Sequence, residues 1–267
     1  MRPSSSRFTP FDGVSSVLLV GVAAFYLLFL ASTAVYLGWA DAAHHLARPV
    51  LWQRLGLTLS TALISTGVAM IVGIPGGYAL ARLPLPIPRV LATVIELPMM
   101  VPPATVGVFL IGAVATPPVA PLLKIAGISL GHSTAGVILC QVAVTTSFAV
   151  CLCAAAFASV PARVETVART LGATWPRAAL GVTLPAARNA LLGATLTVFA
   201  RAAAEWEAVM LFVGASRGAT DVLPFAVFLD WNEGMMGGVV TMSLMSVTVA
   251  TLASLGASLA RRSSHVG

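Results

Sequence analysis

Charged residues are scarce in this chain of 267 residues: Asp, Glu, Lys and Arg together make up 9% of it, against about 25% in an ordinary soluble domain. That shortage nearly excludes a soluble globular fold. Hydrophobic residues make up 58%, so lipid is the solvent that most of the surface is expected to face. The net charge of +6 does not indicate nucleic-acid binding, because the basic residues are thinly scattered and not clustered among aromatic residues.

Cysteine and histidine are also rare. The three cysteines, Cys140, Cys151 and Cys153, fall in one apolar run, and none of the four histidines lies beside them. Free cysteines inside a helix are more often small packing residues than ligands, so we expect no metal site and no cofactor in this chain. A zinc-dependent or His-based active site within the membrane is disfavoured for the same reason, and we expect no catalytic residues.

Long uncharged apolar runs, in contrast, are plentiful. A helix needs about 20 residues to cross the hydrocarbon layer, and only helices and closed barrels cross it with their backbone groups paired. Alternating barrel strands are absent, so the sequence predicts an all-α integral membrane protein with six transmembrane helices and no large extramembrane domain. The first run is too long for a signal-peptide core, so we interpret it as an uncleaved span. The predicted spans are Val14 to Leu37, Leu55 to Leu80, Val90 to Ala115, Ser133 to Ala158, Ala190 to Val213 and Met235 to Leu259.

The basic residues predict the orientation, since cytoplasmic loops carry an excess of Lys and Arg. Of the 15 basic residues, ten fall on one side of the predicted spans, four fall on the other, and Arg201 lies inside a span. We therefore expect both termini in the cytoplasm. The predicted parts are a cytoplasmic tail over 1–13, a transmembrane domain over 14–259 with a cytoplasmic loop over 160–188, and a cytoplasmic tail over 260–267.

The cytoplasmic loop carries the most specific pattern, which indicates two short helices around a glycine corner. Pro161 suits a first helical turn, and Gly172 supplies a stop. The Thr174 hydroxyl is placed to cap the second helix, with Pro176 in its first turn. The residues that share one face of the first helix, at three- and four-residue spacing, are Val164, Val167, Ala168 and Leu171.

This loop resembles the EAA loop of the permease subunits of ABC importers. The family's second acidic position is Thr166 here, while the spacing from Gly172 to Pro185 is intact. The resemblance implies the MetI-like permease architecture and a coupling helix seated in a groove of a separate ATP-hydrolysing subunit. From the residues alone, the alternative is an amphipathic loop lying on anionic headgroups. The matching positions, which the resemblance assigns to ATPase coupling, are Glu165, Ala168, Leu171, Gly172, Val182, Leu184 and Pro185.

Ionisable residues and helix breaks inside the spans predict the transport pathway. An ionisable group at bilayer depth is costly unless it is paired or hydrated. Arg201 and Glu205 lie one turn apart in the fifth span, and Glu96 lies in the third. Arg201 either attracts an anion directly or is neutralised by Glu205 and Glu96, and we favour the pairing. A broken helix at membrane depth is tolerated only inside protein or beside a cavity. The prolines that break the third span are Pro98, Pro102 and Pro103.

These segments resemble the permeases for molybdate, tungstate and sulfate. The family's fifth-span motif has Gly where this chain has Ala204 and Glu207, and we expect Glu207 at an outer vestibule or against a partner protein. The matching stretches are Glu96-Leu97-Pro98 and Val101-Pro102-Pro103 with Gly107 in the third span, Ala200-Arg201-Ala202 with Glu205-Trp206 in the fifth, and Leu223-Pro224-Phe225-Ala226 before the sixth.

Three further residue sets are open to more than one interpretation. Hydroxyl groups along the second and fifth spans are either donors along a pathway or small residues that pack helices together; they belong to Thr58, Thr61, Ser65, Thr66, Thr195 and Thr197. Three methionines are either gate residues or fillers of core gaps, namely Met99, Met100 and Met210. The short outer loops offer charges to a docking partner at Arg217, Asp221, Asp230 and Glu233, and tryptophans suited to the aqueous interface at Trp39, Trp52 and Trp231.

The resemblance implies the permease subunit of an ATP-driven importer in the bacterial inner membrane. It would move a small oxyanion, molybdate or tungstate before sulfate or thiosulfate, into the cytoplasm by alternating access. The implied partners are a second copy in a homodimer, two copies of an ATPase that uses ATP and Mg²⁺, and a periplasmic oxyanion-binding protein. This chain lacks a G-x-x-x-x-G-K-[ST] phosphate loop, so it cannot hydrolyse ATP itself. A secondary transporter is the alternative, although its half-to-half repeat is not evident.

Overall fold

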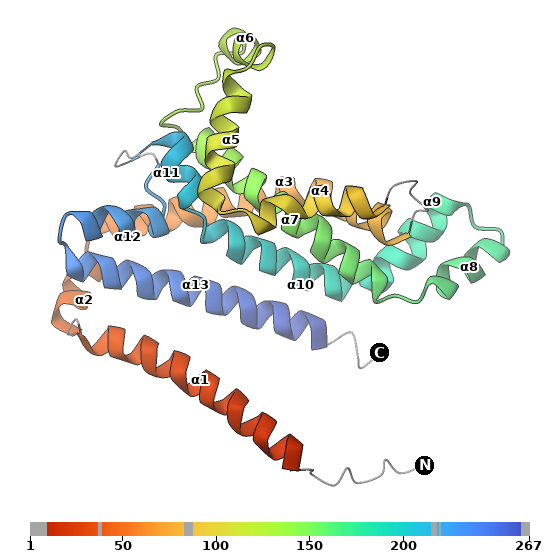
Figure 1. Ribbon diagram of the computed structural model, residues 1–267, viewed down its shortest axis with the longest axis horizontal. Coiled ribbons are helices and arrows are strands. Elements are labelled where there is room, and N and C mark those ends of the chain that lie inside the picture. The colour runs from red at the N-terminus through yellow and green to blue at the C-terminus, as the bar shows by residue number, and fades with distance from the viewer. Residues whose placement is uncertain (1–9, 37–38, 83–87, 215–217, 219, 263–267) are drawn as a thin grey trace.

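Every regular element in the described part of the chain is a helix, which confirms the all-α fold (Figure 1). The structure, a computed structural model, describes residues 10–36, 39–82, 88–214, 218 and 220–262. The two predicted tails lie partly outside these residues, at 1–9 and 263–267. The elements are α1 (Pro10–Tyr36), α2 (Trp39–Leu46), α3 (Pro49–Arg82), α4 (Pro88–Met100), α5 (Pro103–Ala115), α6 (Val119–Ile125), α7 (Thr134–Ala158), α8 (Ala162–Thr170), α9 (Trp175–Ala178), the π-helical turn η1 (Ala179–Thr183), α10 (Leu184–Ala203), α11 (Glu207–Val213), α12 (Leu223–Asn232) and α13 (Met236–Arg262).

Four helices within the described residues are long and apolar enough to cross a membrane: α1, α3, α7 and α13. A fifth crossing results if α4 and α5 count as one bent span. These two helices meet at 109°, so the predicted break in the third span is confirmed. The total of six crossings stays a prediction.

The fifth predicted span, Ala190 to Val213, is not one continuous helix. α10 begins earlier, at Leu184, and ends at Ala203, and α11 follows from Glu207. No proline causes this break. Instead, the Glu205 carboxylate accepts a hydrogen bond from the Ala208 backbone N–H at 2.9 Å, and so satisfies one of the free N–H groups at the start of α11. A polar side chain thus caps the start of a second helix within a run that hydropathy alone predicts as continuous.

The centre of the bundle is the contact between α3 and α7, which is close because small residues meet there. A Cβ atom added at Gly73 would lie 2.6 Å from the Ala149 Cβ, and one added at Gly77 would lie 2.5 Å from the Cys153 Cβ. Small residues four positions apart let membrane helices approach closely. Cys153 therefore acts as a small packing residue in this contact.

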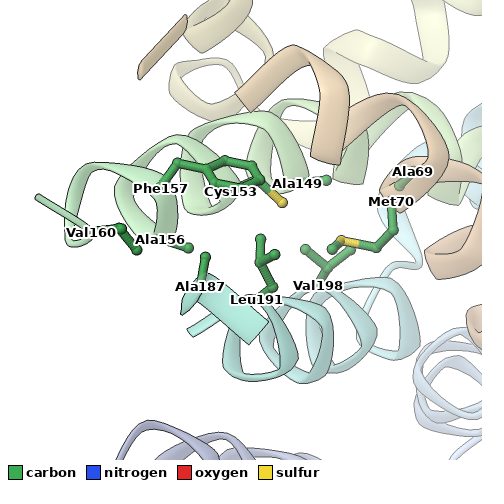
Figure 2. Packing of buried hydrophobic residues seen from close by; sticks show 10 residues of the cluster. All are labelled: Ala69, Met70, Ala149, Cys153, Ala156, Phe157, Val160, Ala187, Leu191 and Val198. Carbon is green, nitrogen blue, oxygen red and sulfur yellow. The ribbon is translucent and has the colours of Figure 1, made fainter. Parts of the chain in front are cut away.

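Buried apolar side chains extend the contact from α7 to α10 (Figure 2). Ala187 and Leu191 of α10 face the end of α7 at Ala156, and Val198 lies near Met70 of α3. Most of these side chains are small or branched, so three helices share one dense core. The remaining members of the cluster are Ala69, Ala149, Cys153, Phe157 and Val160.

Some of the hydroxyl groups singled out from the sequence bond to a neighbouring helix, and others bond within their own helix. Ser65 of α3 donates to the Gln141 Oε1 of α7 at 2.9 Å, and Thr61 accepts from the Gln141 Nε2 at 3.3 Å. Thr195 and Thr197 donate to carbonyl groups of their own helix. Helix packing therefore fits Thr61 and Ser65, whereas the contacts of Thr195 and Thr197 favour neither interpretation. The hydroxyl residues buried on α3 are Thr58, Thr61, Ser65 and Thr66.

The long helices α3, α7, α10 and α13 run along the long axis of the molecule, and the short ones mark its ends (Figure 1). α8 and α9 lie at one end, and α2 and α12 lie at the other. α5 stands away from the bundle with α6 at its tip. The base of α5 packs tightly on α11, since a Cβ atom added at Gly107 would lie 2.9 Å from the Ala208 carbonyl oxygen.

Candidate functional site

The first candidate site is the segment of α8 and α9, where the two predicted short helices are present. Gly172 joins them with φ +94°, a backbone conformation that favours glycine. Thr174 precedes α9 as expected, but its side chain makes no capping hydrogen bond, so that detail of the prediction is wrong. Val182, Leu184 and Pro185 lie where η1 passes directly into α10. The segment is therefore continuous with a long helix of the bundle.

The outer face of α8 is apolar and basic. Leu171 is 83% exposed and Val167 is 55% exposed, while Ala168 is half-buried. The basic side chains exposed beside them are Arg163, Arg169 and Arg177. Exposed apolar side chains at the polar end of a membrane bundle suit a protein partner.

Glu165 differs from its neighbours on α8 because it is buried, at 7% exposure. Tyr78 of α3 donates a hydrogen bond to the Glu165 Oε1 at 2.7 Å, and Thr183 of η1 donates to the Oε2 at 2.9 Å. Arg82 lies near the same carboxylate, with 4.0 Å between its Nε and the Oε2. Sequence reasoning missed these partners, because Tyr78 and Arg82 precede Glu165 by more than 80 positions. The signal that could have indicated them is their four-residue spacing near the end of an apolar run.

The second candidate site is the predicted pair of Arg201 and Glu205. The Arg201 Nη1 lies 2.9 Å from the Glu205 Oε2, and the Glu205 side chain is 1% exposed. The guanidinium also lies over the Phe148 ring, 5.7 Å from its centroid. The preferred pairing is therefore confirmed for Glu205. Glu96 is exposed on α4, and no ion pair between Glu96 and Arg201 is present among the described residues, so its predicted share in neutralising Arg201 is not seen.

The prolines of the third span act differently from one another. Pro98 lies inside α4, which continues to Met100, so it does not end the helix. Pro102 precedes α5 and Pro103 is its first residue, and these two mark the 109° bend. Met100 is 76% exposed. The exposed groups around this bend, Glu96 and Met100, are thus available to a pathway or to a partner. The other predicted gate methionines, Met99 and Met210, are half-buried, as is Glu207 in the first turn of α11.

A buried ion cluster at the α2 and α12 end corrects one prediction. Asp221 and Asp230, expected to offer charges to a docking partner, are only 3% and 5% exposed. Both face Arg54 of α3, which lies 2.9 Å from Asp221 and 3.8 Å from Asp230. The charges pair within the chain because the helix begins at Pro49, earlier than predicted, and so carries Arg54 into the bundle. Of the other two charges, Glu233 is exposed and Arg217 lies outside the described residues.

A cavity of about 400 Å³ lies between α12, α13 and Trp206, and a neighbouring cavity of about 220 Å³ lies between α10, α12 and α13. Trp206, Pro224 and Ser246 line both. The Trp206 ring stacks on Phe228 at a centroid distance of 5.2 Å. The segment after the Glu205 break and the Leu223-Pro224 segment therefore meet at one apolar hollow.

Three comparisons with known proteins agree on one class. Residues 73–265 match the family described as binding-protein-dependent transport system inner membrane component. The molybdenum transport system permease protein ModB of Mycobacterium tuberculosis is 31% identical over 233 residues, which are 87% of this chain and 88% of the relative. The sulfate transport system permease protein CysW of Escherichia coli is 29% identical over 243 residues, covering 88% and 84%.

Among solved structures, the inward-facing MetNI methionine ABC transporter matches with a TM-score of 0.61 at 19% identity. The match covers 80% of this chain and 95% of that chain. At this identity the likeness shows the fold, and it confirms the MetI-like architecture.

Proposed function

The chain belongs to the family of binding-protein-dependent transport system inner membrane components, and from this membership we propose that it is the permease subunit of an ATP-driven importer of a small oxyanion. Molybdate or tungstate is the proposed substrate ahead of sulfate or thiosulfate, because the relative named for molybdenum is the more identical of the two. The chain itself carries the pathway, and a separate subunit hydrolyses ATP with Mg²⁺.

The observation that carries this proposal is the outer face of α8. Leu171 and Val167 are exposed beside Arg163 and Arg169, while Glu165 of the same helix is fixed inside the bundle. A short helix with this exposed face and a fixed base suits docking into a groove of a protein. Two copies of an ATPase would each receive one α8–α9 segment from a homodimer. Closure of the ATPase pair would then draw the two segments together and turn the pathway outward.

The proposed orientation follows from the same assignment. Both termini and residues 160–188 face the cytoplasm, since the ATPase is supplied with ATP there. The end formed by α2 and α12 then faces the periplasm and receives an oxyanion-binding protein. Because Asp221 and Asp230 are buried with Arg54, their charges do not serve that contact, and Glu233 remains the exposed acidic residue named for it.

The proposed pathway runs between the two copies, past the bend of α4 and α5. Exposed Glu96 lies on α4, Pro98 follows within it, and Pro102 and Pro103 create the bend. The Arg201 side chain is 25% exposed and held by Glu205, so a positive group whose charge is largely offset borders the path. That arrangement suits passage, because a pathway that bound a divalent anion tightly could not release it.

Reconstitution tests the proposal. The chain is assembled in lipid nanodiscs with its ATPase, and an oxyanion-binding protein is added with molybdate, tungstate or sulfate. We expect ATP hydrolysis to rise with at least one of the three anions and most with molybdate or tungstate. Stimulation by sulfate alone would correct the substrate and keep the importer. No stimulation by any anion, or uptake driven by a proton gradient without ATP, would refute an ATP-driven oxyanion importer.

A further inference from the structure

The burial of Glu165 is unusual for its position. It lies on α8 between exposed Val164 and exposed Thr166, on a helix whose outer face is open. A carboxylate is rarely buried unless hydrogen bonds or opposite charges compensate it. A partner seated on the exposed face of α8 would meet the residues around Glu165 and not its carboxylate.

The carboxylate joins elements that are far apart in the sequence. Its two oxygens accept from Tyr78 of α3 at 2.7 Å and from Thr183 of η1 at 2.9 Å. The Arg82 Nε, 4.0 Å from the Oε2, has no hydrogen-bond partner among the described residues, so the nearby negative charge compensates it. Hydrogen bonds to a charged group are stronger than those between neutral groups.

Arg82 extends the same connection to the end of α7. Its Nη2 donates to the Phe157 carbonyl at 2.9 Å and also to the Val160 carbonyl. Figure 2 shows Phe157 in the last turn of α7 and Val160 just beyond the end of that helix. The Tyr78 ring also contacts Phe157 edge-to-face, with 5.4 Å between the ring centroids. Glu165 and Arg82 together therefore link α3, α8, η1 and the end of α7 by polar contacts.

Without this link, α8 would be joined to the bundle through two short corners. Pro161 precedes it, and Gly172 with φ +94° follows it. Neither corner belongs to a regular element, whereas the hydrogen bonds of Glu165 attach α8 directly to α3 and η1. We propose that Glu165 is a positioning residue: its carboxylate fixes α8 to α3 and η1, so that a displacement of α8 moves α3 with it. The transmission to α3 rests on the proposed function, whereas the fixing of α8 does not.

The first test needs no ATPase. Hydrogen exchange of the full chain in nanodiscs compares Glu165→Ala with Thr166→Ala, an exposed neighbour on the same helix. We expect amides of residues 162–171 to exchange at least about tenfold faster in Glu165→Ala, with α7 unchanged and Thr166→Ala like the wild type. Tyr78→Phe removes one hydrogen bond, keeps the ring and should give a smaller acceleration. If α8 exchanges at the wild-type rate in both Glu165→Ala and Tyr78→Phe, the proposal is wrong.

The second test uses the chain assembled with its ATPase and binding protein. We expect Glu165→Ala to keep the ATPase bound but to lower the ratio of anion transported to ATP hydrolysed about tenfold or more, with Glu165→Gln intermediate because its amide oxygen still accepts one hydrogen bond. Loss of the ATPase with unchanged exchange in α8 would instead assign Glu165 to direct partner contact. If the wild type transports no oxyanion, the proposed function fails, and the exchange result still decides whether Glu165 fixes α8.

Discussion

Replacement of Arg54 by methionine tests the largest electrostatic feature of the fold. Arg54 is the cation between Asp221 and Asp230, and all three are less than 8% exposed. The Asp221 carboxylate additionally accepts from the Gly218 N–H at 3.1 Å. Methionine keeps most of the side-chain length but removes the guanidinium that lies beside both buried carboxylates.

The expected loss of stability is large. Removing one partner of a buried ion pair costs about 3–5 kcal/mol, because the other charge is left unpaired. For a chain of this size, 1 kcal/mol shifts the melting midpoint by about 2–4 °C. The Arg54→Met variant should therefore melt roughly 6–20 °C below the wild type.

Differential scanning fluorimetry in nanodiscs measures this shift. Arg48→Met is the matched control, since Arg48 is exposed and its guanidinium lies beside the His44 ring; its midpoint should stay within about 2 °C. The double variant Arg54→Met/Asp221→Asn should recover part of the loss, because it also removes the buried negative charge that lies closest to Arg54. A midpoint of Arg54→Met equal to that of Arg48→Met would refute the claim that this cluster stabilises the fold.

Three further predictions concern packing, pairing and the glycine corner. Gly77→Ala should destabilise the fold by about 1–3 kcal/mol, because the added Cβ would lie 2.5 Å from the Cys153 Cβ. Gly56→Ala is the control: Gly56 has open space around it, so this variant should be neutral or stabilising in the same melting assay. Arg201→Met should lower the melting midpoint and Arg201→Lys should restore most of it, whereas a normal midpoint with lost anion uptake would assign Arg201 to the substrate. Gly172→Val should lower the free energy of unfolding by about 1–2 kcal/mol, because φ is +94° there, and should reduce anion-stimulated ATP hydrolysis. Gly181→Val is the control, since Gly181 has an ordinary φ and open space around it, and should have neither effect. Equal activity of the two variants would contradict a role for the glycine corner.

The features that sequence reasoning predicted are local ones. The pairing of Arg201 with Glu205 was predicted from their four-residue spacing, and the bend after Met100 was predicted from consecutive prolines. The break after Ala203 was missed because no proline marks it; the Glu205 carboxylate instead binds a backbone N–H at the start of α11. A hydropathy pattern records how apolar a run is, but not which polar side chain turns back on the backbone.

The features that were missed join positions far apart in the chain. Arg54 and Asp221 are separated by 167 positions, and Tyr78 and Glu165 by 87. No periodicity links such pairs, so each charge was assigned to the nearest predicted loop. The assignment was wrong for Asp221 and Asp230 because burial depends on the helix that packs over a loop and not on the loop itself.

Both buried clusters lie on α3, which gives this helix a particular role in the fold. Arg54 is in its second turn and Tyr78 near its last, about 36 Å apart at 1.5 Å per residue. Between them, Gly73 and Gly77 hold α3 against α7 so closely that a methyl group does not fit. Pro75 lies inside α3 and removes a backbone hydrogen bond, yet it falls between these two glycines, where α7 supports the helix. α3, which connects the α8–α9 end to the α2–α12 end, is thus supported by packing against α7 at the point where Pro75 removes one of its backbone hydrogen bonds.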